Sequence, residues 1–295
     1  VAPFTPMTPD GAVDYDKIAW QATLFRKNKL SGVFVCGTTG EGLSMTLDER
    51  KRVVEEWAKY TDERLKLIVH VGNECLDIAR ELAAHAQHVN AFAVSTIGPV
   101  FFKPKKMELL ADWCAHIAAA APSLLFYYYH IPGLTGLNFP MIDFLPLLEE
   151  RIPNFGGIKY SHENHFDLGY CIRYKNKKYT IFFGMDEILL SGMMAGAQAA
   201  VGSFYNICPA VFNQIIACFN RGELEHAFQL QGHVQDLLRI YFKYGGNVGV
   251  GKAILKAGGI DLGPARPPLP NPDESTFHAL SNELEAINFQ ELIIR

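Results

Sequence analysis

Short runs of β-branched and aromatic residues alternate along the first three quarters of the chain with longer segments whose apolar positions recur at helical spacing. Runs of the first kind predict buried strands, and segments of the second kind predict amphipathic helices. The predicted strands are Gly32–Cys36, Lys66–Val71, Ala91–Thr96, Leu124–Tyr129, Phe155–Lys159, Tyr179–Gly184 and Ala199–Gly202, and Val1–Phe4 supplies the end of one more. The predicted helices between them include Asp14–Lys29, Leu47–Tyr60, Cys75–His88, Lys105–Ala120, Pro140–Glu150 and Cys208–Asn220.

This alternation indicates the fold class. Strands that alternate with helices form a parallel sheet, and eight such units favour a closed (β/α)₈ TIM barrel, an α/β fold, over an open doubly wound sheet. One helix start is also marked by local chemistry, because Thr46 and Glu49 have the spacing of a capping box. We therefore predict a catalytic-type barrel over residues 1–221.

The pattern changes after residue 221. Apolar residues from Leu224 to Tyr241 recur at helical spacing, and no strand candidate follows them. Further helices are predicted at Val248–Ala257 and Glu274–Asn288, with the proline-rich turn Pro264–Pro272 between them. Since no stretch has the composition of a linker, we expect residues 222–295 to form a helical extension that packs on the barrel within a single structural unit.

Composition excludes several classes of function. A net charge of −4 and a pI near 6.2 argue against a nucleic-acid or membrane-surface partner. No apolar run approaches the roughly 20 residues that span a bilayer. The six cysteines are scattered without metal-ligand or redox spacing, which is typical of reduced thiols in a cytoplasmic protein.

The active site of such a barrel lies at the carboxyl ends of its strands, so reactive residues that end predicted strands are candidates. Lys159 ends one of them, directly after Ile158. Burial there would remove much of the hydration of its amine. A neutral amine can attack a ketone and form a Schiff base. The alternative is a lysine that only reaches the barrel rim, and Lys159 alone does not decide between the two.

The Gly37–Gly40 turn supports the chemical interpretation. Its flanking glycines let the backbone approach a ligand, so the amides and hydroxyls of Thr38 and Thr39 can hold a carboxylate. The alternative is a tight turn with no ligand. Tyr129 ends another predicted strand and offers a phenol that can transfer protons, helped by the Thr39 hydroxyl. Strand alternation turns Tyr128 to the opposite face.

Three stretches together resemble the dihydrodipicolinate synthase/N-acetylneuraminate lyase family. They are Gly37–Glu41, Tyr129–Pro132 and Gly157–Lys159, which occur in family order and spacing within a resemblance that covers essentially the whole chain. The resemblance implies that Lys159 is the Schiff-base lysine and that Tyr129 transfers protons. It also implies that Thr38 and Thr39 bind the carboxylate of pyruvate.

Further positions resemble the lyase branch of this family. The synthase branch carries an arginine for a second substrate carboxylate two residues beyond Pro132, where this chain has Leu134, and leucine cannot pair with a carboxylate. Asp186 and Glu187 match a Gly-x-Asp-Glu segment whose carboxylates suit sugar hydroxyls. The alternative is an acidic helix start favoured by the helix dipole, and both interpretations can hold together. The implied substrate-contacting residues are Thr38, Thr39, Ser161, Gly184, Asp186, Glu187, Gly202 and Ser203.

The resemblance therefore implies a class I aldolase that reversibly cleaves N-acetylneuraminate to pyruvate and N-acetylmannosamine. Its expected partners are these small molecules and copies of itself in a homotetramer, with no metal and no cofactor. Two alternatives stay open: a pyruvate-dependent aldolase that acts on 2-keto-3-deoxy sugar acids, and a non-catalytic barrel that binds a keto acid.

Some residues depart from the family pattern. Ser161 stands where threonine is common, and His130 matches the Tyr-His-Ile-Pro stretch of animal lyases rather than the asparagine of many microbial ones. Phe101 and Phe102 stand where microbial relatives carry a tyrosine of the proton relay, and phenylalanine cannot transfer a proton. These residues therefore do not decide whether a proton relay extends beyond Tyr129 and Thr39.

Two motifs that would suggest other functions are rejected. Gly246–Lys252 resembles a phosphate-binding loop, but Ala253 stands where the motif requires Ser or Thr, and the preceding segment is predicted to be helical. His162 and His165 are three residues apart rather than the four of a helical zinc site, and we expect them at the start of a helix.

Overall fold

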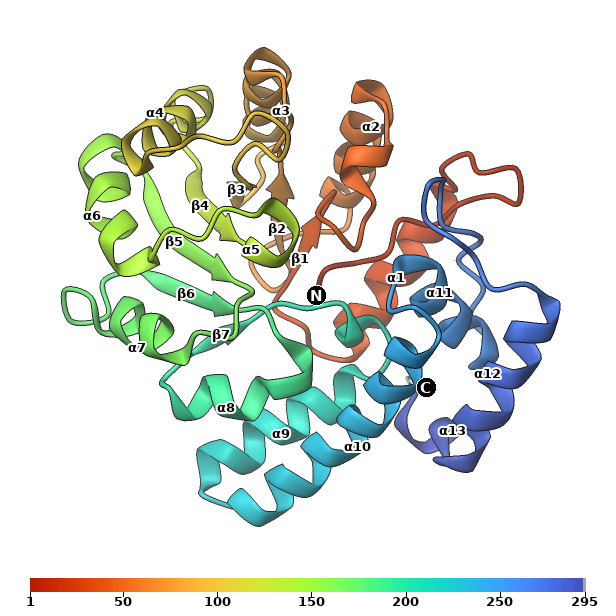
Figure 1. Cartoon of the computed structure of the whole chain (residues 1–295). Coiled ribbons are helices and arrows are strands. Elements are labelled where there is room, and N and C mark those ends of the chain that lie inside the picture. The colour runs from red at the N-terminus through yellow and green to blue at the C-terminus, as the bar shows by residue number, and fades with distance from the viewer. Residues whose placement is uncertain (294–295) are drawn as a thin grey trace.

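The computed structural model describes residues 1–293 and contains a curled sheet of seven parallel strands that are neighbours in chain order (Figure 1). The strands are β1 (Gly32–Val35), β2 (Lys66–His70), β3 (Ala93–Thr96), β4 (Leu125–His130), β5 (Phe155–Tyr160), β6 (Thr180–Phe183) and β7 (Ala199–Ala200). Each lies within a predicted strand or within one residue of it. The expected parallel α/β fold is therefore confirmed.

The first residues of the chain bridge the two edges of this sheet. The Phe34 amide of β1 donates to the Val1 carbonyl (2.8 Å), and the Ala2 amide donates to the Gly202 carbonyl just beyond β7 (2.9 Å). Residues 1–4 form no regular strand, so the expected eighth strand is replaced by an extended segment with bonds to both edges. The fold is TIM-barrel-like, with seven regular strands and this segment in the eighth position.

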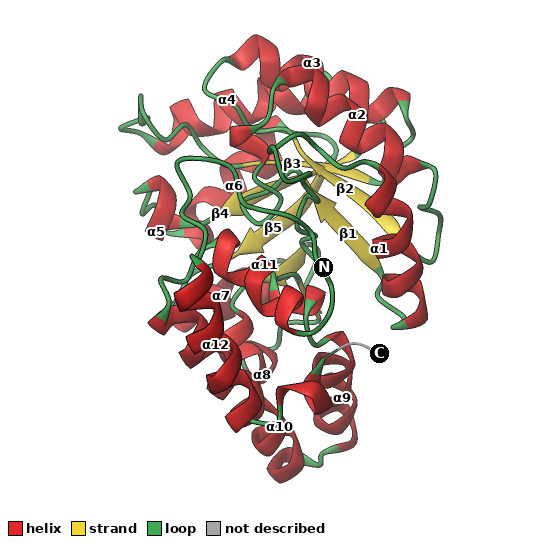
Figure 2. Ribbon diagram, turned by 90° about the vertical axis from the view of Figure 1, so that its right-hand side faces the viewer, coloured by secondary structure: helices red, strands yellow, loops and turns green. Residues whose placement is uncertain are grey.

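Helices follow the strands and surround the sheet (Figures 1 and 2). They are α1 (Asp16–Lys27), α2 (Leu47–Ala58), α3 (Leu76–His88), α4 (Met107–Ala118), α5 (Pro132–Thr135), α6 (Met141–Arg151), α7 (His165–Arg173), α8 (Leu189–Met194) and α9 (Pro209–Arg221). The capping box at the start of α2 is present, with Thr46 and Glu49 each accepting from the other's backbone amide. The short α5 was not predicted, because four residues are too few to show helical periodicity.

Strand alternation separates the barrel interior from the layer between sheet and helices. Tyr128 points outward and packs edge-on against Phe144 of α6, with ring centres 5.1 Å apart. Its neighbour Tyr129 points inward and packs edge-on against Phe34 of β1, at 5.7 Å. The prediction that the two tyrosines face opposite sides is confirmed, and Tyr129 is one of the residues that fill the barrel.

A C-terminal group of helices packs beside the barrel (Figure 1). It consists of α10 (Leu224–Lys243), α11 (Val248–Ala257), α12 (Glu274–Ala286) and α13 (Phe289–Leu292). The 20-residue α10 packs along α9 and also contacts the turn that follows β6. The extension therefore reaches the end of the sheet where the strands terminate. No helix within residues 1–293 is both long and apolar enough to cross a membrane.

Candidate active site

Lys159 lies inside the barrel near the end of β5, and its side chain is only 4% exposed. It is the register partner of Tyr129 on β4, so the two side chains share the inner face. The Lys159 Nζ atom is 3.9 Å from the ring centre of Tyr129 and 4.2 Å from that of Phe34. Within residues 1–293, Lys159 takes part in no ion pair. The amine is thus enclosed by aromatic faces and is not neutralised by a carboxylate.

A cavity of about 170 Å³ opens above this lysine at the carboxyl ends of the strands. Eight of the ten predicted site residues line it: Thr39, Tyr129, Lys159, Gly184, Asp186, Glu187, Gly202 and Ser203. They come from five different strand ends and meet only because the sheet curls. Barrels of this type have their active sites where residues converge in this way at the carboxyl ends of the strands.

The other two predicted residues lie beside the cavity rather than in its wall. Thr38 is exposed and directly precedes Thr39. The Ser161 hydroxyl donates to the Gly184 carbonyl (3.2 Å), and a Cβ on Gly184 would lie 2.1 Å from that hydroxyl oxygen. Any side chain at position 184 would therefore displace Ser161, which explains the glycine.

Thr39 is held by a hydrogen bond across the barrel. Its hydroxyl oxygen is 2.6 Å from that of Ser203, which follows β7. Thr39 follows β1, so the bond joins the loops after the first and last strands of the sheet. It fixes one wall of the cavity while leaving Thr39 in contact with the cavity.

Asp186 has a structural contact as well as a place on the cavity. Its carboxylate accepts from the Phe204 amide (2.8 Å), and a Cβ on Gly202 would lie 1.6 Å from its Oδ1 atom. Burial raises the pKa of Asp186 to about 6 despite that hydrogen bond. Burial also raises the pKa of the neighbouring Glu187. Asp186 and Glu187 begin the short helical turn Asp186–Ile188 and both line the cavity, so the two interpretations of this acidic pair are compatible.

Sequence reasoning missed the part of the wall that α10 supplies. Leu238, Tyr241 and Phe242 of this helix line the cavity opposite the strand ends. Burial, and then the charges of Asp186 and Glu187, raise the pKa of Tyr241 to about 12. Helical periodicity placed Leu238 and Tyr241 on an apolar face, but a sequence pattern does not show what such a face covers.

His70 lies in the barrel interior near Tyr129, with ring centres 6.2 Å apart. Its Nδ1 atom donates to the Cys36 carbonyl (3.2 Å). Burial, with smaller contributions from the charges of Arg50 and Lys159, lowers the pKa of His70 to about 3. The imidazole is therefore neutral at physiological pH and adds no positive charge near Lys159.

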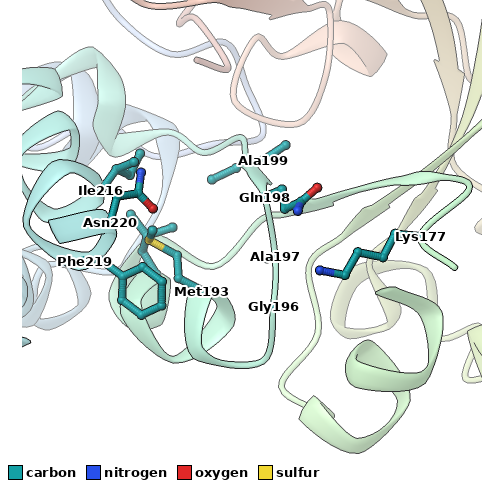
Figure 3. Close-up of a pocket in the computed structure, with 11 residues that line it drawn as sticks. Lys177, Met193, Gly196, Ala197, Gln198, Ala199, Ile216, Phe219 and Asn220 are labelled. Carbon is teal, nitrogen blue, oxygen red and sulfur yellow. The ribbon is translucent and has the colours of Figure 1, made fainter. Parts of the chain in front are cut away.

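A larger cavity, of about 490 Å³, lies elsewhere (Figure 3). Met193, Ile216 and Phe219 face it from one side and Lys177 from the other. Gln198 also lines it and directly precedes β7, so this cavity lies at the amino end of that strand. Catalytic groups of barrels lie at the opposite end. We therefore assign the candidate active site to the smaller cavity.

The remaining sequence candidates lie outside the wall of the cavity. His130 Nε2 is 3.4 Å from His162 Nδ1, whereas His165 Nε2 is 3.1 Å from the Ser191 hydroxyl, so the two histidines of the rejected zinc motif face different partners. Leu134, on α5, is 62% exposed and is not among the residues that line the cavity.

Comparison with known proteins identifies the family. Residues 1–287 match the model of the dihydrodipicolinate synthetase family. The chain is 36% identical to the N-acetylneuraminate lyase of Rattus norvegicus over 98% of this chain and 91% of that protein. It is 38% identical to that of Danio rerio over 91% and 89%. The solved structure of Proteus mirabilis N-acetylneuraminate lyase superposes with a TM-score of 0.93 at 36% identity, covering 98% of this chain and 97% of that one. The chain belongs to the dihydrodipicolinate synthetase family.

Proposed function

We propose that this chain is a class I aldolase, a carbon–carbon lyase that reversibly cleaves N-acetylneuraminate to pyruvate and N-acetylmannosamine. The observation that carries the proposal is the buried Lys159 amine, which faces Tyr129 in a cavity lined by Asp186 and Glu187. The likeness to N-acetylneuraminate lyases over nearly the whole chain supports the choice of substrate.

The reaction begins at Lys159. Its Nζ atom attacks the C2 ketone of the open-chain sugar acid, and loss of water leaves a protonated imine. Thr38 and Thr39 bind the C1 carboxylate through hydroxyl and amide groups of the turn after β1. The aromatic faces of Phe34 and Tyr129 surround the cationic nitrogen, which favours its positive charge.

Bond cleavage follows from this imine. Tyr129, with the substrate carboxylate, removes the proton of the C4 hydroxyl. The O–H bonding pair forms the C4=O bond of N-acetylmannosamine. The C3–C4 bonding pair then forms a C2=C3 bond, and the π pair of the C=N bond moves to the nitrogen, which leaves an enamine. Protonation at C3 and hydrolysis then release pyruvate and the free amine. Asp186 and Glu187 accept hydrogen bonds from the hydroxyl groups of the sugar.

Two measurements test this function. Borohydride added with pyruvate should reduce the imine and add a stable mass to Lys159, located by peptide mass spectrometry. Cleavage rates should be compared on N-acetylneuraminate and 2-keto-3-deoxygluconate. Faster cleavage of 2-keto-3-deoxygluconate would assign another sugar acid as the substrate, and an adduct without cleavage of either would indicate a keto-acid-binding barrel.

We also propose that the protein assembles as a homotetramer. Phe101 and Phe102, in the loop after β3, are 77% and 82% exposed, and an apolar pair in this position is suited to contact with another copy. Light scattering after size-exclusion chromatography should give four times the chain mass of 32.9 kDa. Replacing both phenylalanines by serine should lower that mass, and an unchanged mass would rule this contact out.

We propose that the protein acts in the cytoplasm. All six cysteines are free thiols, and five of them are buried. Burial raises the pKa of Cys114 well above its usual range, so that thiol is inert. Cell fractionation with an antibody to the native protein should place it with cytosolic markers, and recovery with secreted proteins would contradict this.

A further inference from the structure

Glu41 ends the turn that carries Thr38 and Thr39, yet its side chain is completely buried and points away from the cavity. Its backbone has a φ of 55°, in the left-handed region that glycine favours. The next residue, Gly42, must be glycine, because a Cβ there would lie 1.8 Å from the Cys36 carbonyl oxygen. The turn therefore has an unfavourable backbone conformation that other contacts must hold.

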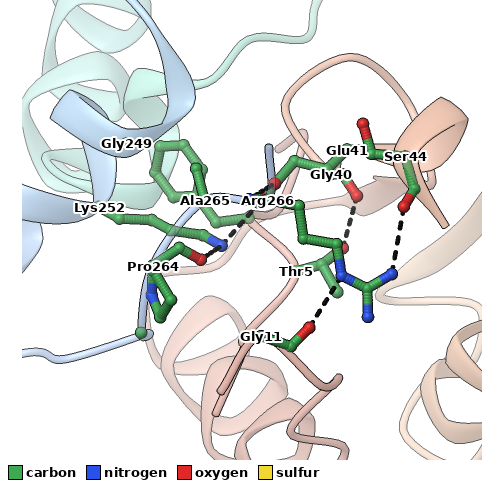
Figure 4. A network of polar contacts seen from close by, with 12 residues as sticks. Thr5, Gly11, Gly40, Glu41, Ser44, Gly249, Lys252, Pro264, Ala265 and Arg266 are labelled. Carbon is green, nitrogen blue, oxygen red and sulfur yellow. Dashed lines mark hydrogen bonds and ion pairs between the residues drawn. The ribbon is translucent and has the colours of Figure 1, made fainter. Parts of the chain in front are cut away.

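The contacts come from the C-terminal extension (Figure 4). Glu41 Oε1 is 2.7 Å from the Nζ atom of Lys252 on α11, and Glu41 Oε2 accepts from the Arg266 amide at 2.7 Å. Lys252 also donates to the Pro264 carbonyl at 2.8 Å and is 2% exposed. Burial lowers the pKa of Lys252, while the Glu41 charge opposes that shift. The buried carboxylate is thus bonded at both oxygens.

Arg266 also contacts the end of the loop that adjoins α2. The Arg266 guanidinium makes two bonds to the Glu49 carboxylate, at 2.6 and 2.7 Å, and donates to the Ser44 carbonyl at 3.1 Å. It also donates to the Gly11 carbonyl at 2.9 Å (Figure 4). Since Glu49 belongs to the capping box of α2, residues of the extension hold the loop between β1 and α2 at Glu41, near its end and at the start of α2.

The turn is held from the barrel side as well. The Thr5 hydroxyl donates to the Gly40 carbonyl at 2.7 Å, and Thr39 is bonded to Ser203. These bonds hold the residues before Glu41, whereas Lys252 holds Glu41 itself. A shift of Glu41 would move Thr38 and Thr39 relative to Lys159, because only two residues separate Thr38 from Glu41.

We propose that Lys252 is a positioning residue for the carboxylate-binding turn, acting through its buried ion pair with Glu41. It contacts no substrate; it sets the place of the Thr38 and Thr39 groups that receive the keto-acid carboxylate. The inference rests on the proposed aldolase function of the same site. It makes the extension a part of the catalytic unit rather than an outer layer.

Lys252→Met tests the proposal, with Lys256→Met as the matched control. Lys256 is on the same helix and is largely exposed, paired with Asp261 at 3.3 Å. In the synthesis direction, Lys252→Met should raise the KM for pyruvate roughly 10-fold or more, while the KM for N-acetylmannosamine stays near that of the native enzyme. The pyruvate concentration that half-saturates borohydride trapping should rise by the same factor. Lys256→Met should change neither.

Glu41→Gln with Lys252→Met provides a second variant that should fold, because it leaves no buried charge unpaired. The amide oxygen introduced by Glu41→Gln can still accept from the backbone N–H of Arg266, so we expect a smaller rise of roughly 3-fold in half-saturation by pyruvate.

The outcomes separate the two proposals. Native protein that forms no trapped adduct and cleaves no sugar acid would refute the proposed function. A native enzyme that works, together with folded variants whose pyruvate half-saturation is unchanged, would overturn the positioning role alone. A purely structural role would lower the amount of active enzyme and leave both KM values unchanged.

Discussion

Two lysines of this protein are almost equally buried, Lys159 at 4% exposure and Lys252 at 2%, yet their surroundings are opposite. Lys252 is bonded to the Glu41 carboxylate and to the Pro264 carbonyl. Lys159 faces two aromatic rings at the wall of a cavity. Burial by itself therefore does not indicate a reactive amine. A buried lysine is available for chemistry when no carboxylate neutralises it and a ligand can reach it.

The two sites also differ in which part of the fold supplies the neighbours. The rings around Lys159 belong to residues of β1 and β4 whose side chains point into the barrel interior. The partners of Lys252 come from the turn after β1 and from the segment before α12. The sheet thus positions Lys159, whereas Lys252 connects the sheet to the extension.

The largest effect is expected from Lys159→Ala. It should reduce turnover on the order of 10⁴-fold or more, because the attacking nitrogen is lost, and it should abolish borohydride trapping with pyruvate. Lys252→Met, in contrast, should still form the trapped adduct. Circular dichroism should show a native fold for Lys159→Ala. Near-native turnover in Lys159→Ala would contradict the distinction between a reactive Lys159 and an ion-paired Lys252.

Tyr129→Phe should reduce kcat by roughly 10²- to 10⁴-fold, since the aromatic face beside Lys159 stays and only the proton-transferring hydroxyl is removed. Trapping with pyruvate alone should continue, because imine formation uses the amine. Phe34→Leu serves as the control for loss of an aromatic face without loss of a hydroxyl. Equal kcat values for native enzyme and Tyr129→Phe would remove Tyr129 from the proposed mechanism.

Substitution of the two lysines should affect stability in the reverse order to turnover: the loss is larger at Lys252 than at Lys159. Lys252→Met leaves the Glu41 carboxylate buried without its cation, which should lower the free energy of unfolding by roughly 3–5 kcal/mol. Adding Glu41→Gln should recover part of this loss. Lys159→Met breaks no ion pair and should cost less than Lys252→Met in denaturant titrations. Equal losses for the two lysine variants would show that the ion pair is not what stabilises Lys252.

The smallest expected effect concerns His70, whose pKa of about 3 is lowered mainly by burial and in part by Lys159. Lys159→Met should raise this pKa, which should remain below the unfolded value of about 6.5 because burial is the main cause. Lys252→Met should leave it unchanged. Nuclear magnetic resonance titration of the imidazole measures both, and an equal shift in the two variants would contradict the proximity of His70 to Lys159.

The same histidine gives a pH dependence of stability with a defined sign. Its folded pKa is below its unfolded pKa, so the unfolded state binds the proton first as the pH falls. The stability that neutral His70 contributes is fully present above about pH 6.5 and is lost as the pH falls towards 3.

The strands and the residues that end them could be predicted because their signals are local. A buried strand needs a few consecutive β-branched or aromatic residues, and a capping box needs two residues three apart. Lys159, Tyr129 and Thr39 were therefore found at strand ends, and the structure brings all three to one cavity. Their catalytic roles stay predictions that the variants above test.

Contacts between distant segments could not be predicted from the sequence. Glu41 and Lys252 are separated by 211 positions, and helical periodicity placed Tyr241 on an apolar face without showing that this face covers the cavity. The replacement of the eighth strand by an extended segment, residues 1–4, with hydrogen bonds to both edges of the sheet could not be predicted either.

The sequence by itself determined the order of strands and helices, the reactive residues at the strand ends and the family resemblance, since each is recorded in neighbouring residues. Only the tertiary structure decided which of the two buried lysines faces a cavity and which is neutralised. That distinction depends on how the sheet curls and where the extension packs, and many local patterns are compatible with either arrangement.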